Sequence, residues 1–191
     1  MIAPLLRSVF KKDQARSQAE TLYAALADQA RAPQFYISAG APDTVEGRFD
    51  VLSLHMALAL ERLREEGDAS ARLTQRLQEV FFERLDSALR EMGVGDLSVG
   101  RKIRGLAEAF YGRYAAYRAG LAENGDALAT ALARNILGSD RPEKARALTL
   151  YMRAAHDALK RASIDDLPSA VGDLRALSRA IGKDESQGDR S

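Results

Sequence analysis

The chain has 191 residues, the size of one ordinary domain, and is long enough to bury a substantial core. It contains no cysteine, which excludes disulfides, zinc–thiolate sites and thiol catalysis. The 28 lysines and arginines nearly balance the 27 aspartates and glutamates, so no overall basic field exists to hold a nucleic acid, and we expect no nucleic-acid recognition.

We predict three parts along the chain: a short amphipathic segment (1–12), a helical domain (13–181) and a polar, disordered tail (182–191). The first segment carries four large apolar residues and ends in basic ones. It can lie at a membrane interface or dock on the domain, and its pattern leaves both open. No run of about 18 apolar residues predicts a membrane-spanning helix, and the first residues lack the apolar centre of a secretory signal.

Apolar residues recur in steps of three and four along most of the chain, as amphipathic helices require. No stretch alternates as a strand does. The sequence therefore predicts an all-α fold, one compact domain of about six to seven helices. The predicted helices cover residues 5–12, 15–31, 49–66, 68–92, 96–121, 124–137, a segment opened by 140–143 and ending near 159, and 167–181.

Breaks between these helices follow from proline, glycine and capping residues. Pro33 ends the helix before it and opens a loop-rich stretch, 33–48. Asp140, with Pro142 in the first turn and Glu143 three residues after the cap, is a variant of the capping box that begins a helix.

The segment 96–121 has the most regular apolar stripe and also an unusual feature, three internal glycines. We expect this stripe to be core, and it consists of Val99, Ile103, Leu106, Phe110, Tyr114, Tyr117 and Leu121. Gly100, Gly105 and Gly112 each cost about 1 kcal/mol relative to alanine inside a helix. They indicate either a close helix–helix approach or a surface for a bound partner.

Catalytic chemistry finds little support in the sequence. The chain has two histidines, and His55 lies beside a strongly apolar face, where a buried histidine bonded to a backbone carbonyl or a tyrosine is expected. His156 precedes Asp157, but adjacent side chains on a helix diverge and form no dyad. No phosphate loop, dinucleotide fingerprint or nucleophile elbow is present. We expect no enzyme activity, no metal and no cofactor.

A basic cluster, Arg101, Lys102 and Arg104, opens the helix at 96–121. Cations are favoured at the opposite end of a helix by its dipole. The cluster either serves a partner or is a solvated face that pairs with Asp96 and Glu108.

Several motifs together resemble those of the ubiquinol–cytochrome c chaperone family. They are GVGDLSVGRK at 93–102, AFYGR at 109–113, GRFDVLSLH at 47–55 and QARAPQFY at 29–36. The first pair is fairly specific, because its glycines and aromatic pair are unusual in a helix. The resemblance extends from about Ala19 to Ser178, with its core at 35–137.

The resemblance implies an assembly chaperone for the cytochrome bc1 complex that binds cytochrome b or another subunit during biogenesis. It also implies a second assembly factor or the ribosome as a partner. From the missing secretory signal and membrane span we expect a cytoplasmic location, which leaves peripheral contact with the inner membrane open. The chain lacks a mitochondrial-type targeting extension, which suggests a bacterial member. The alternative is a helical adaptor or regulatory protein with a different protein client.

The family motifs also nominate a partner-binding surface. We expect them to place Phe35, Tyr36 and Tyr111 near the surface, beside Arg48, Arg101, Lys102 and Arg113. A mixed aromatic and basic patch suits a partner helix or a membrane-proximal loop. The simpler interpretation is that Phe35 and Phe110 are core residues and the arginines are solvated.

Overall fold

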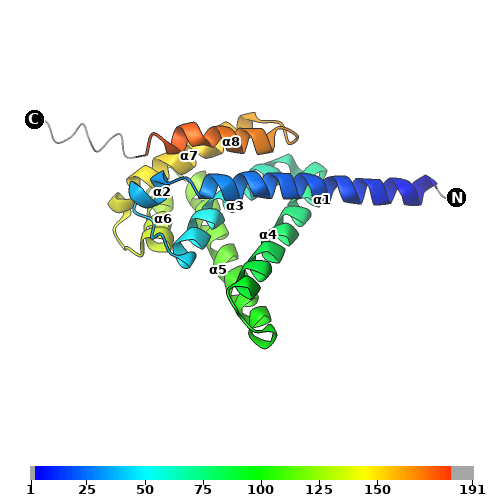
Figure 1. Cartoon of the computed structure of the whole chain (residues 1–191). Coiled ribbons are helices and arrows are strands. Elements are labelled where there is room, and N and C mark those ends of the chain that lie inside the picture. The colour runs from blue at the N-terminus through cyan, green and yellow to red at the C-terminus, as the bar shows by residue number, and fades with distance from the viewer. Residues whose placement is uncertain (1–2, 182–191) are drawn as a thin grey trace, which may run out of the picture.

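The computed structural model describes the backbone of residues 3–181 and the side chains of residues 14–181, and all regular secondary structure in this part is helical (Figure 1). The prediction of an all-α fold is confirmed. Seven of the helices described have more than ten residues, and the shorter elements are the one-turn α2 and two 3₁₀ turns. The elements are α1 (Ala3–Ala30), α2 (Gln34–Ile37), α3 (Val45–Glu66), η1 (Gly67–Ser70), α4 (Ala71–Glu91), α5 (Asp96–Ala122), α6 (Ala127–Leu137), η2 (Pro142–Ala145), α7 (Arg146–Arg161) and α8 (Leu167–Ser178).

Helix α3 forms the centre of the core. All eleven residues from 53 to 63 are buried, so the helix is covered on every side rather than on one stripe. Its Arg62 also caps a neighbour: the guanidinium donates to the carbonyl oxygens of Leu159 (3.2 Å) and Ala162 (3.0 Å) at the end of α7. Carbonyls at a helix terminus have no partner within the helix, so this arginine satisfies them and fixes α7 on α3.

A buried polar network connects three helices near this centre. Nδ1 of His55 lies 2.8 Å from the carbonyl oxygen of Val51, which can only accept, so Nδ1 carries the proton. Nε2 therefore accepts from the Tyr151 hydroxyl at 2.8 Å, and Gln29 donates to the same hydroxyl oxygen at 3.1 Å. The prediction that His55 is buried and bonded to a backbone carbonyl or a tyrosine is confirmed, and the ring has both partners. Burial lowers the pKa of His55 to about 4, so the imidazole stays neutral.

The α4–α5 hairpin projects from this body (Figure 1). It is joined to the body by an aromatic cluster, in which the rings of Phe81 and Phe110 lie 4.9 Å apart and those of Tyr23 and Phe81 6.5 Å apart. Beyond the cluster the hairpin is poorly covered. From residue 82 to residue 109 only Val99 is buried, and Leu97 at the tip is 98% exposed.

Several boundaries differ from the predictions. The predicted helices at 5–12 and 15–31 are one continuous helix, α1; the side chains of 1–12 and the tail 182–191 lie outside the described residues. Helix α3 begins at Val45 rather than at 49, because the Thr44 hydroxyl accepts from the Gly47 amide (3.1 Å). The predicted capping box is wrong, since no side chain caps η2 and its Pro142 and Glu143 form a 3₁₀ turn.

The glycines of α5 differ sharply in what surrounds them. A Cβ at Gly120 would lie 2.6 Å from the backbone of Leu128, so α5 and α6 cross there without room for a side chain. A Cβ at Gly100, Gly105 or Gly112 would meet nothing within 4 Å. A close helix–helix approach therefore does not explain these three, and the second interpretation, a partner surface, stays a prediction.

Candidate binding groove

A groove with a volume of about 640 Å³ lies where the hairpin meets the body. One wall consists of the second half of α4 and the first half of α5; the other consists of the end of α1, the start of α3 and α2. Its surface is mainly apolar. The apolar lining residues are Tyr23, Ala27, Ala30, Val45, Phe49, Leu52, Leu85, Ala88, Leu89, Met92, Leu106 and Ala109.

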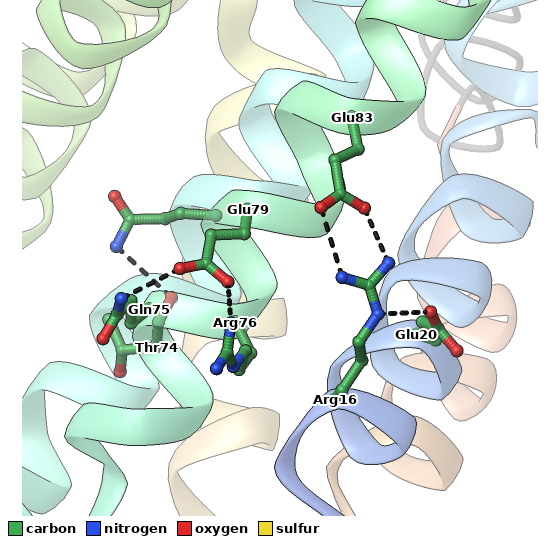
Figure 2. A network of polar contacts seen from close by, with 8 residues as sticks. Arg16, Glu20, Thr74, Gln75, Arg76, Glu79 and Glu83 are labelled. Carbon is green, nitrogen blue, oxygen red and sulfur yellow. Dashed lines mark hydrogen bonds and ion pairs between the residues drawn. The ribbon is translucent and has the colours of Figure 1, made fainter. Parts of the chain in front are cut away.

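Helix α4 crosses α1 beside the groove, and polar contacts join the two helices there. Figure 2 shows the polar contacts at that crossing: Arg16 of α1 makes two hydrogen bonds to Glu83 of α4, at 3.2 and 2.7 Å, and a third to Glu20 at 3.0 Å. These hydrogen bonds lower the pKa of Glu83. Both partners are about half exposed, so the pair contributes little to stability.

The side chains that line the groove include five cations and two acids. Three of the cations, Arg31, Arg84 and Lys102, have no ion-pair or hydrogen-bond partner among residues 14–181. Arg48 pairs with Asp43 at 2.7 Å and lies over the ring of Tyr36, 5.7 Å from its centre.

The remaining cation, Arg113, is largely buried and lies on the floor. It pairs with Asp50 at 2.8 Å and lies 5.7 Å from the centre of the Phe49 ring. Burial raises the pKa of Asp50, and the neighbouring guanidinium opposes this rise. Since Arg113 neutralises Asp50, Glu46 is the one acid left to oppose the three unpaired cations, and the groove is electropositive.

Four of the seven predicted partner-binding residues line this groove: Tyr36, Arg48, Lys102 and Arg113. The Tyr36 hydroxyl donates to the carbonyl oxygen of Ala30 at 2.7 Å, which fixes its ring at the rim.

The other three predicted residues lie elsewhere. Phe35 is fully buried, with its ring 5.1 Å from His55 and 4.9 Å from Tyr151, so the expectation that it lies near the surface is wrong. Its position follows from α2, whose single turn packs this side chain into the core. Tyr111 is 44% exposed but lies outside the groove and donates to Gln78 at 2.6 Å. Arg101 is exposed and also lies outside it.

Arg101, Lys102 and Arg104 make no ion pair within the described part of the chain, and Asp96 pairs instead with Arg90. The expected pairing of the cluster with Asp96 and Glu108 is therefore not observed. Phe110 is fully buried, as the simpler interpretation of the patch holds.

Sequence reasoning missed Arg31, Arg84 and the apolar lining from α4. Leu85 and Met92 fit the same helical stripe as the core residues Leu77 and Phe81, so periodicity marked all four as core. No signal in one sequence separates apolar residues that meet a neighbouring helix from those that face a groove. Leu106 was misplaced for the same reason: it is half-buried and lines the groove.

The groove offers a mainly apolar surface with cations at its edge. Within residues 14–181 no group of three or more His, Asp or Glu side chains could hold a metal ion, and no described helix is long and apolar enough to cross a membrane. The fold and the site define an all-helical domain with an open groove, whose surface is mainly apolar and whose rim is cationic.

Comparisons with known proteins agree with this class. The profile of the ubiquinol–cytochrome C chaperone family matches residues 38–174, and the chain belongs to this family. Over 122 residues it is 29% identical to ubiquinol-cytochrome-c reductase complex assembly factor 1 of Xenopus laevis. The aligned region covers 63% of this chain and 61% of that protein. The chain thus spans less than two thirds of that relative.

A solved structure is similar over almost the whole chain. The crystal structure of the Cbp3 homolog from Brucella abortus superimposes with a TM-score of 0.73 and 38% sequence identity, covering 91% of this chain and 94% of that one. The resemblance stated from the motifs is confirmed at the level of the family. The matched segment 38–174 contains α3, α4 and α5, which together supply most of the groove.

Proposed function

We propose that this protein is an assembly chaperone of the cytochrome bc1 complex and holds a segment of one of its subunits in the groove. The observation that supports this most directly is the groove itself, in which an uncovered apolar floor lies beside three unpaired cations. A monomeric protein rarely exposes such a surface without a partner for it. The family indicates the process, which is assembly of the bc1 complex, and the groove is the place where we expect the client to bind.

Cytochrome b is the client we expect, as a subunit of a membrane complex whose apolar segments need cover before assembly. The chaperone binds and releases it without catalysis. The site of action is the cytoplasmic side of the inner membrane, in peripheral contact with it, with a second assembly factor or the ribosome as further partner. The named relative is a ubiquinol-cytochrome-c reductase complex assembly factor, which supports the same process here.

The first experiment is deletion of the gene in the native host, with haem spectra and bc1 activity of the membranes as readout. Loss of the cytochrome b signal, restored by the wild-type gene, supports the proposal. Normal bc1 levels would contradict it and favour an adaptor with a different client.

Two neighbouring cations provide the matched pair for the groove. Lys102 lines it and Arg101 does not, although both are exposed and lie side by side on α5. We expect Lys102→Glu to complement the deletion poorly and Arg101→Glu to complement it as well as wild type. If the two variants complemented the deletion equally well, the function would not depend on the charge in the groove.

A further inference from the structure

The groove's chemistry defines its occupant more narrowly than the proposed function does. Arg31, Arg84 and Lys102 come from three different parts of the chain and surround one largely apolar surface, where they have no ion-pair partner among residues 14–181 and Glu46 is the one acid of the lining left to oppose them. Like charges that converge on a concave apolar surface repel one another and attract a ligand of opposite sign. The surface is therefore complementary to an apolar ligand with acidic edges.

The backbone of the occupant must also be satisfied. The floor is lined by alanine, leucine and aromatic side chains, which offer few hydrogen bonds to an extended chain. No strand exists in residues 3–181, so no sheet edge is available for strand addition. A helix satisfies its own backbone groups and needs only side-chain contacts.

The small residues on the walls fit the same occupant. Gly105 and Ala109 on α5 and Ala27 and Ala30 on α1 all line the groove, and their small size leaves room in it. No neighbour among the described residues explains the cost of a glycine at position 105, because a Cβ there would meet none of them within 4 Å. A small residue at this point lets a helix approach the wall closely.

We propose that the groove binds an amphipathic helix of a partner protein, with apolar anchors at i, i+3 or i+4, and i+7 and with Asp or Glu on the flanks. The inference rests on the proposed function in taking the groove as the client site. It adds that the recognised feature is a helix with acidic edges.

Two designed helical peptides test the charge rule. Both carry the same leucine anchors; one has glutamate and the other lysine at the flanking positions, and binding to the full-length protein is followed by fluorescence anisotropy. We expect the acidic peptide to bind at least about tenfold more tightly, with the difference shrinking as salt rises. Equal affinities, or no binding by either peptide, would overturn the proposal.

Charge reversal in the protein provides the converse test. Arg84→Glu with Lys102→Glu should invert the preference, so that the lysine-flanked peptide binds more tightly. Arg101→Glu with Arg104→Glu changes the same charge on the outer surface of the hairpin and should leave the preference as in wild type. If the outer pair has the larger effect, the groove is not the site.

A steric test separates binding from folding. Gly105→Leu places a side chain into the groove, whereas Gly112→Leu places one at an exposed position two turns further along α5 that does not line the groove. Neither has a neighbour to displace, and both remove a glycine from a helix, so Tm should stay or rise in each. Peptide binding should fall at least about tenfold for Gly105→Leu only. Unchanged binding in that variant would overturn the proposal.

These measurements use purified protein and do not depend on bc1. If the deletion strain loses cytochrome b but the peptides show no charge preference, the helix inference fails while the assembly role stands. If the strain has normal bc1 and the preference and its inversion are observed, the groove chemistry is supported and the client is another protein.

Discussion

Helix α3 and the outer part of the α4–α5 hairpin are built from similar apolar patterns but end in opposite environments. In α3 every residue from 53 to 63 is buried, whereas between 82 and 109 only Val99 is. The hairpin nevertheless keeps Leu85, Leu89 and Leu106 at helical spacing. An apolar stripe that its own fold leaves uncovered is the surface that we propose a partner covers.

The largest difference between the two regions should appear in matched leucine truncations. Leu58 is 1% exposed, so Leu58→Ala should lower the free energy of unfolding by about 2–5 kcal/mol, through lost burial and a cavity. Leu106 is half-buried in the groove wall, and Leu106→Ala should cost only about 1 kcal/mol. Urea unfolding measures both. Equal losses would mean that the hairpin is as tightly packed as the body.

The polar network of the body should make its stability depend on acid. The folded pKa of His55, about 4, lies below the ordinary value of 6.5, so the unfolded chain binds the proton more readily. The stabilisation is complete above pH 6.5 and decreases as pH falls toward 4, by about 3 kcal/mol in all.

Unfolding free energies at several pH values between 4 and 7 check this slope. His55→Leu should be less stable at neutral pH and show a shallower slope, whereas His156→Gln keeps the His55 network and should retain the steep one. A slope unaltered by His55→Leu would assign the acid sensitivity to other groups.

The glycines of α5 sharpen the comparison along a single helix. At Gly120, inside the body, a Cβ would overlap the backbone of Leu128, which cannot move aside as a side chain could. Gly120→Ala should therefore destabilise by about 1–3 kcal/mol. Thermal unfolding of the variant tests this, and an unchanged Tm would show that α5 and α6 can separate at no cost.

The sequence predicted the fold class and most helices because the apolar period is a property of each segment by itself. It also predicted the environment of His55, since a lone histidine in an apolar stretch must find local partners. Boundaries were lost where a cap overrides composition, as at Thr44, whose hydroxyl starts α3 four residues before Phe49.

The site was predicted in part, and the misses have a physical cause. Tyr36, Arg48, Lys102 and Arg113 lie in sequence motifs, and the fold brings them to one groove. Phe35 is adjacent to Tyr36 in the chain but lies on the opposite side of α2, in the core. Which side of a single turn faces inward depends on tertiary contacts that one sequence does not contain.

The smallest expected effect is at Gly112, on the exposed side of the same α5 that is closed at Gly120. A Cβ there meets nothing within 4 Å, so Gly112→Ala should remove the entropic penalty of glycine without any clash. We expect a gain of about 1 kcal/mol or less, read as a rise in Tm. The change from glycine to alanine would then stabilise the protein at Gly112 and destabilise it at Gly120, because the packing around these two positions of α5 differs. A loss at Gly112 would instead mean that the hairpin surface is covered in solution, which self-association measured by sedimentation would reveal.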